Sequence, residues 1–159
     1  MKIEPFIDES LVQILPSIES GSGSDKDAFY ETVSKKIAQD LSGLDAKTLR
    51  DAFLKREAIS TTAEPLGVAF PHAVLEDLEE IYVGVMRVKQ PLEFGASDNV
   101  PTDLFFFIIG GSDKIWQQGR ILARLGRFAH SRDFLRKCRK ATTPSDLFTL
   151  LREEDLRHV

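Results

Sequence analysis

Three histidines are the side chains of this chain best suited to proton or group transfer, namely His72, His130 and His158. His72 stands in the run Phe-Pro-His-Ala at positions 70–73, directly after a short apolar segment, where open α/β sheets place ligand groups. Pro71 fixes its own φ and biases the preceding residue to extended backbone, so the imidazole that follows has a defined direction. A neutral imidazole is a nucleophile and a proton carrier near pH 7. The alternative is a hydrogen-bonded loop histidine with no chemical role.

The other reactive side chains lie in less favourable settings. Cys138 stands in a basic run at residues 136–140, and cations can lower the pKa of a thiol. We expect instead an inert cysteine on a solvated helix face, and we expect the basic run to be surface rather than a phosphate or RNA site. His130 follows a predicted helix, whose C-terminal dipole favours a cation, and His158 falls in a predicted frayed tail.

Composition and motifs exclude several classes of function. The 159 residues carry 21 basic and 25 acidic side chains, a net charge of -4, which disfavours non-specific nucleic-acid binding. One cysteine forbids an intrachain disulfide and fits a reducing compartment, and so few histidines and cysteines argue against a metal site. Neither a Gly-x-Ser-x-Gly elbow nor a Walker loop is present. The N-terminus lacks the apolar core of a signal peptide, and the longest apolar stretch, 104–109, is too short to span a membrane. We therefore expect a cytoplasmic protein.

Apolar spacing predicts helices at both ends of the chain and strands in the middle. Every fourth residue from Phe29 to Leu41 is apolar, which indicates a helix beginning after Ser24 or Asp25. Residues 102–109 are apolar on both faces, as in a central strand covered on two sides, and Gly110-Gly111 is expected to end it. Further elements are expected as strands at 11–15, 67–70 and 81–88, helices at 45–57, from 112 or 113 to 129, after 131 and from 143, a turn at 98–99 and a loop at 20–24.

This order of elements predicts the α/β class, a single-domain sandwich with a central mixed β-sheet flanked by helices on both faces. The domain is expected to comprise residues 1–159, with a core at about 10–152.

The segment from Arg56 to His72 reads REAISTTAEPLGVAFPH. It resembles the type-2 enzyme IIA domain of the bacterial phosphoenolpyruvate-dependent phosphotransferase system, of the fructose, mannitol and nitrogen-regulatory branch. That family shows Arg-Glu, a Ser/Thr-Thr pair and Gly-apolar-Ala-apolar-Pro-His at this spacing. The run DNVPTDLFF at 98–106, the helix around 121–125, Phe134 and residues 145–147 are also similar to the family, so the resemblance covers most of residues 10–152.

The resemblance implies a phosphoryl relay centred on His72. The histidine would accept a phosphoryl group from a phosphorylated HPr-type carrier protein and pass it to a IIB domain or use it to signal to a regulated target protein. Arg56 would stabilise the phosphoryl oxygens, and Thr61 and Thr62 would donate hydroxyl hydrogen bonds to them. No cofactor or metal is implied, and neither nucleic acid nor membrane insertion is expected.

The sequence departs from the family pattern near the expected site. Many members carry a second histidine near the start of the helix after the central strand, where this chain has Gln118. Glutamine can donate a hydrogen bond but cannot become a cation. Ala73 replaces a frequent glycine, and Glu64 would repel a phosphoryl group if it faced the site.

Three hypotheses follow: a phosphocarrier, a regulatory protein-binding module of the same fold with weak or lost phosphotransfer, and a degenerate relative that no longer accepts phosphate. The sequence names neither a sugar, nor a downstream partner, nor an oligomeric state.

Overall fold

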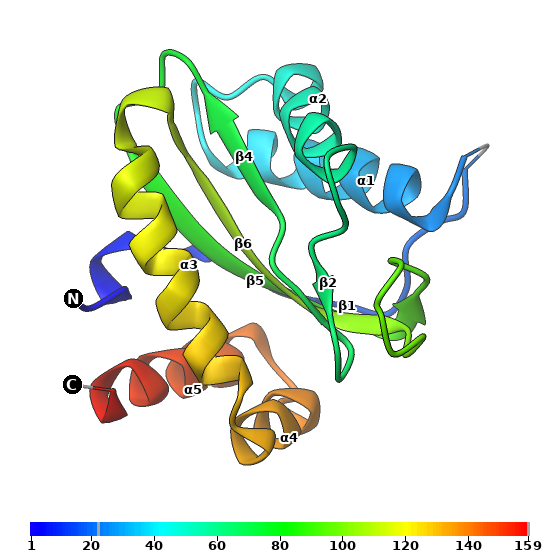
Figure 1. The fold of residues 1–159 in the computed structure, drawn as a ribbon, viewed down its shortest axis with the longest axis vertical. Coiled ribbons are helices and arrows are strands. Elements are labelled where there is room, and N and C mark those ends of the chain that lie inside the picture. The colour runs from blue at the N-terminus through cyan, green and yellow to red at the C-terminus, as the bar shows by residue number, and fades with distance from the viewer. Residues whose placement is uncertain (22, 159) are drawn as a thin grey trace.

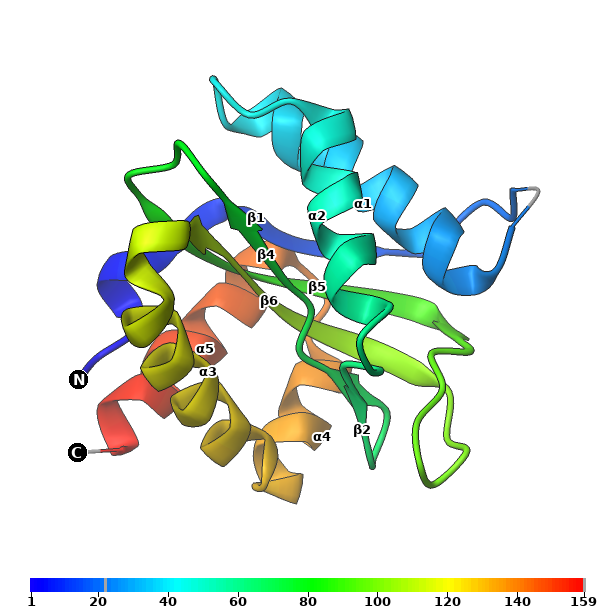
Figure 2. The same cartoon turned by 45° about the horizontal axis from the view of Figure 1, so that its top comes forward.

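The computed structural model describes residues 1–21 and 23–158, and within them one mixed sheet carries helices on both faces (Figures 1 and 2). Ser22, in the loop expected at 20–24, lies outside the described residues. The strand order is β1-β5-β6-β3-β2, and β4 also pairs with β6. The strands are β1 (Ile7–Leu15), β2 (Ala63–Glu64), β3 (Val68–Ala69), β4 (His72–Leu75), β5 (Ile81–Leu92) and β6 (Thr102–Gly111).

The sheet is mixed because its pairs differ in direction. β1 runs parallel to β5, β5 antiparallel to β6, and both β3 and β4 run parallel to β6. Side chains of β6 alternate between two apolar clusters, with Phe106 and Ile108 in one and Phe105 and Phe107 in the other. The expected central strand, covered on both sides, is therefore confirmed.

Five α-helices cover the two faces of the sheet within the described residues. The cluster containing Phe29, Tyr30 and Phe53 places α1 and α2 on one face, and the cluster containing Leu125 and Leu151 places α3, α4 and α5 on the other. Figure 2 shows this separation, and the predicted α/β sandwich is confirmed. The helices are α1 (Asp25–Asp40), α2 (Ala46–Glu57), α3 (Ile115–Ala129), α4 (Arg132–Lys140) and α5 (Pro144–Arg157).

Short polar side chains begin four of these helices. Ser24, Asp45, Ser131 and Thr143 each accept a hydrogen bond from a backbone N–H in the first turn, which satisfies a donor that the helix itself cannot pair. The cap expected from Ser112 or Asp113 is wrong. Those residues form a 3-10 turn (Ser112–Lys114), and α3 begins after it without a side-chain cap.

Three strand predictions need correction. β1 begins at Ile7 rather than near Leu11, because its parallel pairing with β5 extends toward the N-terminus. β6 ends at Gly111 as expected, but Gly110 and Gly111 belong to the strand and pair with Val74 and Leu75 of β4, so the strand extends two residues beyond Ile109. No strand was expected at β4, because a segment of four residues that begins with a polar side chain shows no clear alternation of polar and apolar positions.

A buried ion pair between α3 and α5 also binds the N-terminal segment of the chain. Arg124 of α3 donates from Nε to Asp155 of α5 at 2.7 Å, and both side chains are almost fully buried. The same carboxylate accepts from the backbone N–H groups of Ile3 and Glu4 at 3.0 Å. Burial raises the pKa of the Asp155 carboxyl, but the hydrogen bonds from Arg124, Ile3 and Glu4 outweigh it, and the pKa is lowered.

We predict that Asp155→Asn lowers the free energy of unfolding by about 3–5 kcal/mol, because it leaves the buried Arg124 charge without its counter-ion. Urea denaturation at pH 7 measures this, with Glu153→Gln on the exposed side of α5 as the matched control. Since the pKa of Asp155 is lower in the folded state, its contribution should be lost as pH falls through that value. Equal stability of the two variants would contradict the prediction.

Candidate functional site

His72 lies where a strand along one edge of β6 is interrupted and begins again. β3 and β4 pair in parallel with successive parts of β6, and Phe70 and Pro71 separate them. The Pro71 carbonyl accepts from the N–H of Ile108 at 3.1 Å, so the interruption stays fastened to the sheet. His72 is therefore the first residue of β4, whereas the sequence placed it directly after a strand. Its direction is set by the sheet as well as by the proline.

The guanidinium of Arg56 reaches this imidazole from the last turn of α2. Its Nε donates to Nε2 of His72 at 3.1 Å, and its Nη1 donates to the Ser60 carbonyl at 2.8 Å. Because a guanidinium offers only donors, Nε2 must carry a lone pair. The proton of the neutral ring is therefore on Nδ1, which lies 3.4 Å from the carbonyl oxygen of Phe70. The structure thus brings together the two side chains that the resemblance selected.

The environment of His72 favours the neutral ring. Burial lowers the pKa of this half-buried imidazole, and the nearby Arg56 cation lowers it further. The Phe70 carbonyl and the Glu57 carboxylate act in the opposite direction without reversing the result, and the pKa of His72 is lowered. At pH 7 the ring is neutral, and Nε2 has the lone pair that a nucleophile requires.

An open depression of about 450 Å³ gives solvent access to His72 between α2, β4 and Ser112. Two cations, Lys55 and Arg56, and two carboxylates, Asp51 and Glu76, line it, and Ile59 and Val74 add exposed apolar surface. A neutral imidazole beside a guanidinium with unused N–H groups can attack an electrophilic phosphorus while the cation binds its oxygens.

The two threonines expected to bind phosphate use their hydroxyl hydrogens elsewhere. Thr61 Oγ1 donates to the Phe94 carbonyl at 2.6 Å, and Thr62 Oγ1 donates to Glu57. Thr62 is also buried. Each hydroxyl has a single hydrogen to donate, so neither is free for a phosphoryl oxygen in this arrangement. Both threonines lie in the segment that follows α2, but their hydroxyl groups are bonded to Phe94 and Glu57 and not to His72.

Gln118, which the resemblance placed at the family's second-histidine position, is buried in the first half of α3. Its Nε2 donates to the Gly111 carbonyl at 2.8 Å. A Cβ built on Gly110 would lie 2.4 Å from the same amide nitrogen, so the side chain lies flat against that glycine. Gln118 thus joins α3 to the end of β6 at Gly111, three positions along the strand from Ile108, which pairs with His72.

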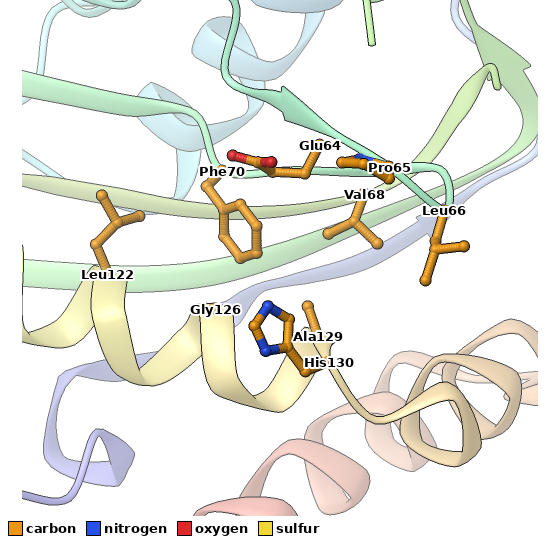
Figure 3. A pocket seen from close by; sticks show the side chains of 9 residues that line it. All are labelled: Glu64, Pro65, Leu66, Val68, Phe70, Leu122, Gly126, Ala129 and His130. Atoms are coloured by element: carbon orange, nitrogen blue, oxygen red, sulfur yellow. The ribbon is translucent and has the colours of Figure 1, made fainter. Parts of the chain in front are cut away.

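Glu64 lies outside the depression that contains His72. It lines a separate pocket of about 480 Å³ between the β2–β3 hairpin and α3, with Phe70, Leu122 and His130 (Figure 3). The repulsion of a phosphoryl group expected from a Glu64 that faces the site therefore does not apply to this geometry.

The remaining reactive side chains have structural surroundings. Cys138 is buried rather than on the solvated face that the sequence predicted, and burial raises the pKa of its thiol to about 12. Cys138 is therefore a poor nucleophile, as expected, but because it is buried and not because it lies on a solvated helix face. His130 follows α3 as expected. His158 does not lie in a frayed tail, since its ring contacts Phe128 and Glu154.

The basic run on α4 is largely paired with acids. Arg136 and Lys137 contact Asp133, and Arg139 binds Asp103 at 2.8 Å. In the described part of the chain, no three His, Cys, Asp or Glu side chains gather to hold a metal ion. Nor does any helix of that part have the length and apolar character for crossing a membrane.

Sequence reasoning overlooked Glu57, whose carboxylate is buried beside Arg56 and accepts hydrogen bonds from Tyr30, Lys26 and Thr62. Its position directly after Arg56 in the quoted segment was the available signal. An acidic residue at the end of a helix is usually a solvated one, and its partner Tyr30 lies far away in the sequence.

We predict that His72 titrates below its ordinary value near 6.5, because burial and the Arg56 cation disfavour the imidazolium. NMR titration of the imidazole C–H resonances measures this. Arg56→Gln should raise the midpoint, since it removes a positive charge beside the ring, whereas Arg132→Gln on the exposed side of α4 should not change it. A midpoint at or above 6.5 in the unchanged protein would contradict this account.

Comparisons with known proteins identify the family of this chain. The family model described as phosphoenolpyruvate-dependent sugar phosphotransferase system, EIIA 2, matches residues 6–154. The nitrogen regulatory protein of Bradyrhizobium diazoefficiens is 30% identical over 138 residues, which cover 87% of this chain and 88% of that protein. A fructose-specific EIIA component of Haloferax volcanii is 30% identical over 65% of this chain and 67% of its own length.

Solved structures show the same fold. The nitrogen regulatory protein IIA-Ntr of Neisseria meningitidis superposes with a TM-score of 0.81 at 19% identity, over 94% of this chain and 98% of that one. Enzyme IIA for mannitol from Escherichia coli, solved in complex with phosphorylated enzyme IIB, superposes with a TM-score of 0.68 at 13% identity, over 92% and 99%. The chain belongs to the EIIA 2 family of the phosphoenolpyruvate-dependent sugar phosphotransferase system, and it is a phosphoryl-transfer component of that type.

Proposed function

We propose that Nε2 of His72 is the atom that accepts the phosphoryl group. The observation that carries this proposal is the 3.1 Å hydrogen bond from Arg56 Nε, because it requires a lone pair on Nε2 and places a cation beside it. The ring opens onto the solvent-accessible depression, where a protein donor can present its phosphoryl group.

In the proposed step, the Nε2 lone pair forms a bond to phosphorus while the phosphorus–nitrogen bond of the donor's phosphohistidine breaks. The electron pair of that bond returns to the donor imidazole. His72 keeps its Nδ1 proton, and the Phe70 carbonyl oxygen facing that proton stabilises the positive charge that develops on the ring. Arg56 leaves Nε2 as phosphorus approaches, and its N–H groups bind the equatorial oxygens. The reverse sequence passes the group on.

The donor in this proposal is an HPr-type carrier protein, and the recipient is a IIB domain or a regulated target protein, with the whole relay in the cytoplasm. The mannitol relative was solved with phosphorylated enzyme IIB, which supports an acceptor of that kind. Several relatives carry the name nitrogen regulatory protein, which supports a regulatory use of the phosphorylated state. Glu64 faces another pocket, and Gln118 bonds within the fold, so neither opposes phosphorylation in this geometry.

We predict that the chain gains one acid-labile phosphoryl group when it is incubated with phosphoenolpyruvate, enzyme I and HPr of the same cell, because His72 is neutral and accessible. Intact-mass spectrometry measures the gain. His72→Ala should abolish it, and the matched His130→Ala should keep it, since His130 lines the other pocket. An unchanged protein that gains no mass would overturn the proposed function.

The fate of the label then separates the two uses of the phosphoryl group. Transfer to an added IIB domain supports a role in sugar transfer. Retention in the presence of every IIB domain of the cell supports a regulatory role.

We predict that Arg56→Gln slows phosphoryl acceptance far more than Gln118→Ala. The arginine supplies a charge next to the reacting nitrogen, whose loss should slow transfer by about a hundredfold or more. The amide of Gln118 is bonded to Gly111, so its removal should slow transfer less than about tenfold. Quench-flow measurement of the labelling rate compares the two. A larger loss in Gln118→Ala would show that the glutamine contacts the phosphoryl group.

A further inference from the structure

The Glu57 carboxylate is the centre of a buried network that joins three segments. Its Oε1 accepts from Tyr30 Oη at 2.7 Å and from Thr62 Oγ1, and its Oε2 accepts from Lys26 Nζ at 2.9 Å and from Thr62 N at 3.2 Å. The donors come from α1 and from the segment that follows α2. Every group that faces the carboxylate in this network donates, so only an ionised carboxylate satisfies all of them.

Thr62 is the residue through which this network reaches the imidazole. Its backbone carbonyl accepts from the N–H of Phe70 at 3.0 Å, and the carbonyl of Phe70 faces His72 Nδ1 at 3.4 Å. Its backbone N–H and hydroxyl are both held by Glu57. One side of the imidazole is therefore supported by a chain of contacts that begins at this carboxylate.

The other side of the imidazole depends on the same segment. The Arg56 guanidinium is held between the Ser60 carbonyl and His72 Nε2. Ser60 lies between Glu57 and Thr62, the two residues that the network joins, so the position of its carbonyl depends on that link. Both groups that contact the ring nitrogens are thus fixed through one buried carboxylate.

We propose that Glu57 is a positioning residue for phosphoryl transfer, which acts through Thr62 on the two groups that hold the His72 ring. This inference rests on the proposed function of His72. The carboxylate does not line the depression around the imidazole and forms no hydrogen bond with the ring, so we expect it to act on the position and electrostatics of the ring and not on partner binding. Its ionised state is supported by the hydrogen bonds from Thr62, Tyr30 and Lys26, which outweigh burial and lower the pKa of Glu57.

The test compares Glu57→Gln with Glu31→Gln, the same change at a partly exposed position of α1. The amide introduced by Glu57→Gln keeps one acceptor oxygen but turns its NH₂ group toward groups that donate, so one of the two hydrogen bonds to Thr62 is lost. We expect the ¹⁵N resonances of both His72 ring nitrogens to shift, and the maximal rate of phosphorylation by HPr to fall by about tenfold or more. The HPr concentration for half-maximal rate should stay within about twofold, and Glu31→Gln should change none of these.

Thr62→Val provides a second test that keeps the carboxylate with its Tyr30 and Lys26 partners. It should produce the same two changes, and it is decisive if circular dichroism shows Glu57→Gln to be unfolded. A folded variant in which the ring resonances or the maximal rate stay unchanged overturns the inference, because Glu57 then stabilises the fold without positioning the ring. An unchanged protein that takes no label defeats the proposed function instead, whereas the ring resonances still report whether Glu57 positions His72.

Discussion

The hydrogen bond from Arg56 to His72 is the interaction on which the proposed chemistry of this fold depends. It decides which ring nitrogen carries the lone pair, because a guanidinium has nothing to accept with. It also places a permanent cation beside a ring that must stay neutral, which is compatible with a half-buried imidazole whose pKa is already lowered by burial. The same charge that disfavours the imidazolium is suited to the oxygens of an incoming phosphoryl group.

Arg56 and His72 are accessible because the strand that lies beside β6, the most buried strand of the sheet, is interrupted. β6 is covered on both faces, so its own side chains cannot reach a partner protein. β3 and β4 pair with it on either side of Phe70 and Pro71, which lets His72 keep the rigidity of the sheet while the depression beside α2 leaves the ring accessible. Rigidity and access together are what in-line transfer to a fixed nitrogen requires.

The sequence predicted those features that depend on local chemistry. The helix starts at Ser24 and Thr143 follow from their capping side chains. The central position of β6 follows from its apolar side chains on both faces. The pairing of Arg56 with His72 was expected from the family resemblance. It could not predict where hydroxyl and amide groups find partners. Thr62 and Gln118 both use hydrogen bonds within the fold, and such partners are decided by tertiary packing. The expected single domain over residues 1–159 stays a prediction.

Gln118 also bears on how the site responds to pH. A second imidazole at this position would titrate near neutrality and add a variable charge, whereas glutamine has none to gain or lose. Glu57 is held ionised by its hydrogen-bond donors, which lower its pKa. The pKa of His72 is lowered by burial and by the Arg56 cation, so its ring changes charge below its ordinary value near 6.5. With glutamine and not histidine at position 118, the charge of the proposed acceptor His72 depends on the titration of its own ring, beside the Arg56 guanidinium.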